Sequence, residues 1–230
     1  MLFVTFLWRG RGFPHHQPPV YGPKHVAVLA SMLARHGGHR LACVTDDDMH
    51  GLIGQPAVEL LALPEPVAGL PGFYPKLWAF SGELAAALDD EPFALIDLDT
   101  VILGDLVTLS RPAFAIWAGA KGEAQQYNTS LVIHPSLRPE VWDRFSVEVA
   151  GVAERAAVAS SFRWTGDQSW VGYVLGRDEP MFGEADGVYQ YRPKRHREAP
   201  PDDAKVMFMC GPIDPAGEAK HSEWVKAAWR

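Results

Sequence analysis

Residues 93–103 form an apolar run that is interrupted by two carboxylates, Asp97 and Asp99, and then resumes. A continuous aliphatic run is typical of a strand that is covered on both faces, as in a parallel sheet. Open parallel sheets bind their ligands at the carboxyl ends of the strands, which is where these two residues lie. The run therefore predicts an α/β domain with a ligand site at this strand end.

The spacing of the two aspartates suits a divalent cation. In an extended chain Asp97 and Asp99 would point to opposite faces, but a turn that begins there lets both carboxylates reach one ion. Buried carboxylates repel each other, so a cation or solvent is expected beside them. The alternative is that they only cap the turn that follows. The apolar residues on both sides favour the site.

Length and charge narrow the class of protein. A chain of 230 residues with 47% hydrophobic residues can bury a sizeable core and fits one large α/β domain. The net charge of -7 argues against nucleic acid as a partner, because phosphate contacts need basic clusters. The basic stretch 192–197 is interpreted as a solvated face, with a ligand-phosphate role as its alternative.

The chain shows no sign of secretion or membrane insertion. Cys43 and Cys210 make no disulfide framework, which is consistent with a reducing compartment, and we expect a cytoplasmic protein. No segment has the length of a transmembrane span. Residues 1–8 lack both the basic residues and the cleavage site of a signal peptide, so they are interpreted as the first core strand.

The order of predicted elements indicates a mostly parallel central sheet with helices on both faces. In the first part we expect strands at 2–8, 40–45, 57–63 and before Asp97, with helices at 25–36 and 74–88. In the second part we expect strands at 113–117, 130–134 and 205–210, helices at 139–145 and 166–175, and a terminal helix or turn at 223–230. The domain would span residues 1–230, with a nucleotide-binding half of about 1–110 and an acceptor-side half of about 111–230.

Three motifs in this order resemble those of the nucleotide-diphospho-sugar glycosyltransferases of the GT-A fold. They are Asp97-Leu98-Asp99 after a strand, Tyr127-Asn128-Thr129-Ser130 opening the next strand, and Gly166-Asp167-Gln168 opening a helix. The likeness is greatest to glycogenin-like and bacterial lipopolysaccharide-type retaining enzymes of family 8. Their motifs read Asp-x-Asp, Asn-Ser-Gly and Asp-Gln. Residues 206–215 followed by Trp224 resemble that family's closing segment.

The resemblance implies transfer of a sugar, with retention, from a nucleotide-sugar donor to an unknown glycan, lipid or protein acceptor. The donor would be a UDP-sugar, and Asp97 and Asp99 would hold Mn²⁺ or Mg²⁺ against its diphosphate. Lys76 matches a basic residue that contacts the donor; the alternative is a solvated lysine. Asp167 and Gln168 would be the catalytic residues beside the donor sugar.

Other site residues are implied in the same way. Asp167 has a helix N-cap as its alternative role, and Asn128 would bind the sugar or else form a turn. Thr5 and Tyr21 resemble the residues that flank the base, with the Tyr21 ring stacked on uracil. Asp46 could contact the ribose. A separate metal site at His15, His16 and His25 is a further alternative to unpaired surface histidines.

The chain departs from the family at three points. The closing His, the usual third metal ligand, is replaced by Cys210 in one alignment and by Phe208 in another, while His221 is a further candidate. Thr129 and Ser130 replace the Ser and Gly of the second motif. Asp214 stands where the family has a basic residue, so Lys220 or Lys226 would have to contact the phosphates.

Two other functions remain open. A haloacid dehalogenase-type phosphatase also places Asp-x-Asp after an apolar strand, although there the motif lies near the N-terminus and is followed by residues absent here. A degenerate GT-A-like protein could bind a nucleotide sugar or glycan without turnover, and the missing His favours that reading.

Overall fold

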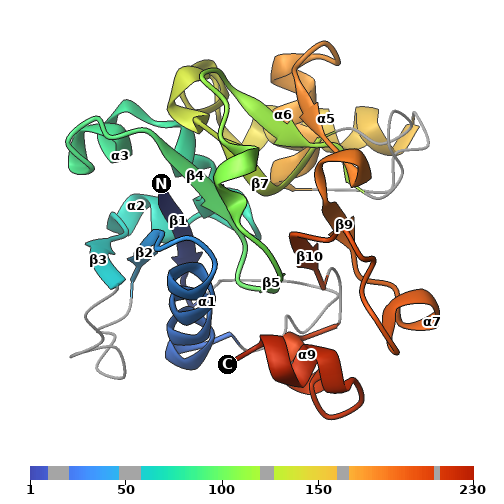
Figure 1. Cartoon of the computed structure of the whole chain (residues 1–230). Helices are drawn as coiled ribbons and strands as arrows, with labels where there is room; N and C mark the ends of the chain where they lie inside the picture. Colours follow the sequence, from blue (N-terminus) through green and yellow to red (C-terminus); the bar gives the residue numbers. More distant parts are fainter. Residues whose placement is uncertain (10–20, 47–57, 120–126, 160–165, 210–212) are drawn as a thin grey trace.

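A computed structural model of the chain describes residues 1–9, 21–46, 58–119, 127–159, 166–209 and 213–230 (Figure 1). Within these residues the main sheet has seven strands in the order β3-β2-β1-β4-β7-β6-β8. Their bounds are β1 Leu2–Leu7, β2 Arg40–Thr45, β3 Val58–Ala62, β4 Phe93–Ile96, β6 Ala115–Trp117, β7 Asn128–Ile133 and β8 Met181–Phe182. The first four are parallel to one another, and β7 runs antiparallel to both β4 and β6. The predicted mostly parallel sheet is confirmed.

Strand β1 lies inside the sheet because all its residues are apolar or small and every one is buried. Alternate side chains enter two different hydrophobic clusters, with Phe3 and Leu7 on one face and Val4 and Phe6 on the other. This is the pattern of a strand covered on both sides. It pairs with β2 on one edge and β4 on the other.

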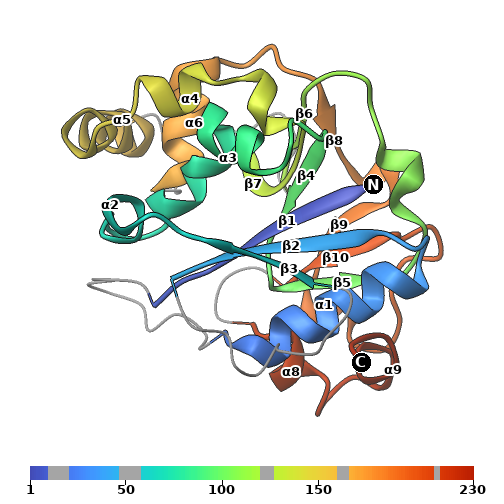
Figure 2. The same cartoon turned by 90° about the vertical axis from the view of Figure 1, so that its left-hand side faces the viewer.

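Helices cover both faces of the sheet, as predicted (Figure 2). On one face lies α1 (Pro23–Arg35), which buries Val26, Leu29, Met32 and Leu33 at helical spacing. The opposite face is covered by several elements, namely α2 (Glu65–Ala68), η2 (Tyr74–Phe80), α3 (Gly82–Ala87), α4 (Glu140–Asp143), α5 (Val147–Ala159) and α6 (Asp167–Leu175).

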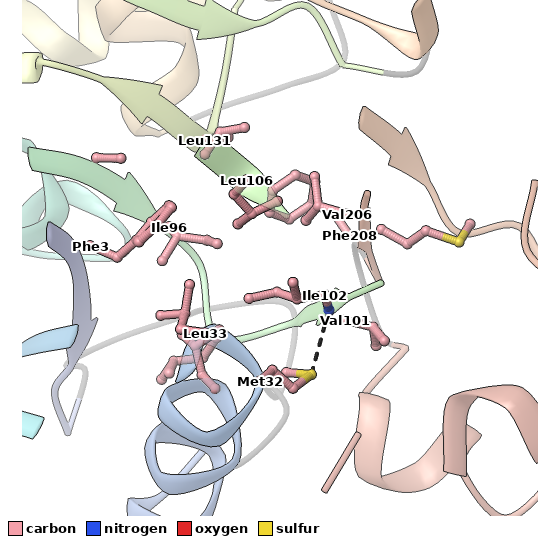
Figure 3. Close-up of a cluster of buried hydrophobic side chains, with 14 of the residues drawn as sticks. Phe3, Met32, Leu33, Ile96, Val101, Ile102, Leu106, Leu131, Val206 and Phe208 are labelled. Carbon is pink, nitrogen blue, oxygen red and sulfur yellow. Dashed lines mark hydrogen bonds between the residues drawn. The ribbon is translucent and has the colours of Figure 1, made fainter. Parts of the chain in front are cut away.

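A small second sheet, in the order β5-β10-β9, extends the core beyond α1. Its strands are β5 (Thr100–Ile102), β9 (Val188–Gln190) and β10 (Val206–Phe208), and β10 is antiparallel to β5. Met32 of α1 packs under this sheet, with its sulfur 3.4 Å from the backbone nitrogen of Ile102 (Figure 3). The Phe208 ring stacks on Trp117, with centroids 4.6 Å apart, and so joins the two sheets.

The remaining short elements are η3 (Leu106–Leu109), η6 (Glu184–Asp186), α7 (Pro193–His196), α8 (Pro215–Glu218) and α9 (Glu223–Ala228), together with η5 (Pro135–Leu137), which contacts β4 and η2. The predicted strand at 205–210 is confirmed as β10, and the C-terminal helix as α9. No helix in the described part of the chain combines the length and apolar character needed to cross a membrane.

One helix prediction needs correction, and one helix was missed. The segment 74–88 is two elements, because Ser81 takes an extended backbone and caps α3 by accepting a hydrogen bond from the Leu84 N–H at 3.1 Å. The preceding residues form the tighter 3₁₀ helix η2, all of whose residues are buried. Helix α5 was not predicted, since its Ala- and Val-rich sequence has little amphipathic contrast and leaves Val149 and Val152 exposed.

Candidate active site

The turn that carries the two aspartates is anchored on both sides. Asp97 directly follows β4, and its N–H donates to the carbonyl of Ser130 in β7 at 3.1 Å. The Thr100 hydroxyl donates to the Asp97 carbonyl, which closes the turn. On the other side the Met209 N–H donates to the Asp99 carbonyl at 2.8 Å. The predicted turn at the end of this strand is therefore present, and it joins the two sheets.

Lys76 reaches this strand end from η2 and bridges two acids. Its ammonium nitrogen lies 3.0 and 3.1 Å from the two carboxylate oxygens of Asp97 and 3.1 Å from Oδ2 of Asp167. The exposed fraction of the side chain is 7% for Lys76, 3% for Asp167 and 24% for Asp97. The alternative of a solvated lysine is wrong.

The two acids keep Lys76 charged. Burial alone would lower the pKa of Lys76, but Asp167 and then Asp97 outweigh that effect, so the pKa is raised above its ordinary value. Lys76 is therefore a permanent cation between two segments that lie far apart in the sequence.

Asp167 is held by a second contact, which the sequence did not reveal. The hydroxyl of Thr129, on β7, donates a short hydrogen bond to Asp167 Oδ2. Helix α6 begins at Asp167, with Gly166 at the N-cap, so Asp167 opens the helix as predicted and does not cap it. The alternative capping role is not observed. A Thr or Ser one residue after the strand-opening Asn128 is the feature that could have indicated this contact.

Asn128 and Gln168 flank this centre differently. The Asn128 side-chain oxygen accepts from the Ser130 N–H at 2.9 Å, a local contact of the kind expected from the turn-forming alternative. Gln168 Oε1 is buried and has no hydrogen-bond partner among the described residues. It is therefore an acceptor that a ligand hydroxyl could satisfy.

Asp99 carries a second unsatisfied acceptor. Its Oδ1 is inaccessible and makes no hydrogen bond within the described residues. Burial, followed by the carboxylate of Asp97, raises the pKa of Asp99 to about 7, against the opposing effect of Lys76. Asp97 and Asp167 contact the ammonium of Lys76, while Asp99 is affected by the charges of Asp97 and Lys76 without contacting the ammonium. Negative charge is in excess when all three carboxyls are ionised.

These two aspartates fit a hard divalent cation. Oxygen ligands suit Mg²⁺ and Mn²⁺, and the unpaired Asp99 Oδ1 is a ligand atom without another partner. Among the described residues, however, no three His, Cys, Asp or Glu side chains converge as a metal site. Cys210 lies outside the described residues. Phe208 is buried against Trp117, so the alignment that places it at the closing position supplies no ligand.

The predicted nucleotide-side residues, Thr5, Tyr21 and Asp46, come from other segments of the chain. Thr5 is buried in β1, and its hydroxyl has no hydrogen-bond partner among the described residues. Tyr21 precedes α1, and its ring meets His25 edge-on with centroids 5.0 Å apart. Asp46 accepts from the backbone N–H of Arg9 at 3.1 Å, an exposed contact. None of these contacts tests the predicted role toward a nucleotide.

His25 is occupied by protein contacts. Its Nδ1 accepts from the Gly22 N–H at 3.1 Å, so neutral His25 carries its proton on Nε2, which lies 3.2 Å from Asp214 Oδ1. His15 and His16, its predicted partners in a metal site, lie outside the described residues.

Asp214, at the position where the family has a basic residue, has a structural role. Its carboxylate accepts from the N–H groups of Ala216 and Gly217, both at 3.2 Å, and caps α8. Of its two proposed substitutes, Lys226 pairs with the exposed Glu223 and Lys220 lies in the turn after α8.

The chain is similar to known proteins in its fold but not detectably in its sequence. No family model matches the sequence, and no curated protein matches it. The galactosyltransferase LgtC, crystallised with donor and acceptor sugar analogues, is 13% identical with a TM-score of 0.59 over 100% of this chain and 97% of that one. The glycosyltransferase GlyE of Streptococcus pneumoniae is 12% identical, with a TM-score of 0.58 over 93% of this chain and 56% of that one.

A third structure, mouse xyloside xylosyltransferase 1, is 11% identical with a TM-score of 0.50, over 91% of this chain and 98% of that one. Identities this low carry the backbone arrangement and not the activity. The chain therefore shares the fold of these solved glycosyltransferases, the GT-A fold.

Proposed function

We propose that this protein transfers a sugar from a nucleotide-diphosphate donor, a UDP-sugar, to a glycan, lipid or protein acceptor. The observation that carries the proposal is the buried bridge from Asp97 through Lys76 to Asp167. A buried lysine between two carboxylates costs desolvation energy, and side chains buried in this way are concentrated at functional sites. The cytoplasmic location expected from the cysteines belongs to the same proposal.

The chemistry of sugar transfer suits this arrangement. As the bond between sugar and diphosphate breaks, negative charge grows on the diphosphate and positive charge on the sugar ring. Asp97 and Asp99 would hold Mn²⁺ or Mg²⁺, which when bound stabilises the departing diphosphate. Lys76 fixes the orientation of Asp97 and Asp167, and its ammonium supplies a positive charge beside the diphosphate.

The sugar would lie against the start of α6. The carboxylate of Asp167, held by Lys76 and Thr129, presents negative charge to an oxocarbenium-like sugar. The unpaired Gln168 Oε1 would accept a hydrogen bond from a sugar hydroxyl. Retention of configuration is proposed from the family resemblance of these two residues.

Two alternative functions, a phosphatase and a non-catalytic binding protein, are distinguished from sugar transfer by the fold and by turnover, respectively. The phosphatase alternative does not fit the GT-A fold. Binding without catalysis is favoured by one observation, the absence of a third metal ligand among the described residues. Release of UDP from a donor distinguishes an enzyme from a binding protein.

A thermal-shift screen tests the proposal. The wild-type protein is heated with UDP, GDP, UDP-glucose and UDP-galactose, each with Mn²⁺ or with EDTA, because a ligand of the folded state raises its apparent stability. We expect a rise in Tm with uridine nucleotides and Mn²⁺ that the Asp99→Asn variant loses. If no nucleotide shifts Tm, the proposal fails. If UDP binds but is released from neither UDP-glucose nor UDP-galactose, with or without simple sugar acceptors, binding without catalysis replaces sugar transfer as the proposed function.

A further inference from the structure

Glu154 of α5 joins two segments of the site from outside it. Its Oε1 accepts a hydrogen bond from the Tyr74 hydroxyl at 2.6 Å and another from the Gly166 N–H at 2.7 Å. Both donors thus converge on one oxygen of a half-buried carboxylate. No described contact places Glu154 against Lys76, Asp97 or Asp167 themselves.

The two donors are close in sequence to the residues of the ion pair. Tyr74 opens η2, the element that carries Lys76, and Gly166 directly precedes Asp167. Lys76 and Asp167 then contact each other at 3.1 Å. The contacts therefore form a closed ring, in which Glu154 holds the backbone of the two segments and the ion pair holds their side chains.

Each arm of this ring is well fixed. Burial, and then the hydrogen bond to Glu154, raises the pKa of Tyr74, so its hydroxyl keeps the proton that it donates. The Tyr74 ring also packs on Phe145, with centroids 5.0 Å apart. Hydrogen bonds to an ionised carboxylate are about twice as strong as those between neutral groups.

The second arm holds a backbone conformation that few residues adopt. Gly166 has a φ of +80°, in the region that favours glycine. With the N–H of Gly166 fixed by Glu154, the chain turns into α6 at a defined angle. The next two residues, Asp167 and Gln168, are those proposed to face the sugar.

We propose that Glu154 is a positioning residue for the sugar side of the site, setting the separation of Lys76 from Asp167 and Gln168 without touching the donor. The inference rests on the proposed function for its kinetic consequences and on the ring of contacts for its structural ones. It predicts that Glu154 acts on turnover much more than on UDP binding, since Asp97 and Asp99 are anchored separately by Ser130 and Met209.

Kinetics give the first test. For release of UDP from UDP-glucose or UDP-galactose with Mn²⁺, Glu154→Ala should lower kcat by about tenfold to a hundredfold, as expected when a reacting group is misplaced. KM and the calorimetric affinity for UDP should change little. Glu154→Gln, whose amide oxygen still accepts both hydrogen bonds, should recover most of the loss. Glu148→Ala, an exposed acid on the same helix, is the matched control.

A double-mutant cycle gives the second test and needs no turnover. The shift of the urea midpoint caused by Tyr74→Phe or Glu154→Ala is measured in the wild type and in a Lys76→Met background. A ring of contacts predicts a smaller shift once Lys76 is gone, because the ion pair at the far side is already lost. Additive shifts, or a Glu154→Ala enzyme with the kcat of Glu148→Ala, would overturn the assignment. If wild type turns over neither donor but the cycle is coupled, the proposed function fails for these donors while the structural role of Glu154 stands.

Discussion

Lys76 and Asp167 form a buried ion pair that joins η2 to the first residue of α6, with 3.1 Å between the ammonium nitrogen and Oδ2. Asp97 lies on the other side of the same ammonium, at 3.0 Å. The side chains of Lys76 and Asp167 are almost wholly withdrawn from solvent. Removing Lys76 would leave the buried carboxylate of Asp167 without its counter-charge, whereas removing Asp167 would leave Lys76 still paired with Asp97.

The first prediction concerns this pair. Lys76→Met should lower the free energy of unfolding by about 3–5 kcal/mol, the usual cost of stranding a buried charge. Urea denaturation measures the change. The double variant Lys76→Met with Asp167→Asn should recover part of the loss, since the stranded charge is gone. Lys226→Met, which removes an exposed pair with Glu223, is the control and should change little. Equal effects of the two lysine variants would contradict the buried bridge.

Asp167→Asn tests the sugar side. The asparagine oxygen can still accept from the Thr129 hydroxyl, but the negative charge that we propose to face the sugar is lost. Release of UDP from the donor should therefore fall far more than the affinity for UDP measured by calorimetry. Equal losses of turnover and of UDP affinity would assign Asp167 a structural role instead.

A third prediction follows from the raised pKa of Asp99. Its pKa rises from 3.8 to about 7 in the folded protein, so the folded state holds this proton more tightly than the unfolded state does. With EDTA present, the stability contributed by the protonated carboxyl is complete below about pH 4 and is lost as the pH rises to about 7. Urea midpoints at several pH values should show wild type losing stability relative to Asp99→Asn across this window. Parallel pH profiles would exclude the shift.

The last prediction concerns Cys210, which follows the residue whose N–H holds the Asp99 carbonyl. If Cys210 stands in for the family's closing His, Cys210→His should preserve or raise the affinity for Mn²⁺ in the presence of UDP, because a thiol must first lose its proton to bind. Cys210→Ala weakens the metal only if the thiolate is a ligand. No change in either variant, by calorimetry, would direct attention to another ligand such as His221.

The elements predicted correctly from sequence are those whose burial can be inferred from the local pattern of apolar and polar residues. Residues 40–45 were assigned correctly because a short apolar run between polar ends has one simple interpretation, and β2 has these bounds. Strands β5, β8 and β9 were not predicted. Each has three residues or fewer, and such short strands form only because a partner from elsewhere in the chain lies beside them.

The site divides in the same way. Asp97 and Asp99 could be located from sequence because their carboxylates interrupt an apolar run. The burial of Lys76 could not be predicted from sequence. It depends on two acids from distant segments, and the residues next to Lys76 in the sequence give no sign of them. Glu154 lies in α5, whose helical character is hidden by a nearly uniform run of small apolar residues.

The hydrogen bond from the Met209 N–H to the Asp99 carbonyl has a consequence for folding during synthesis on the ribosome. The parallel strands β1 to β4 can pair once residue 96 has emerged, whereas Asp99 gains its second anchor only when β10 has been synthesised and has closed against β5. Closing a loop of this length is slow, because its entropy is lost before the contacts are made. A nascent chain would therefore form its parallel strands before the turn that carries Asp97 and Asp99 is fixed, and the proposed cation site would be completed late in synthesis.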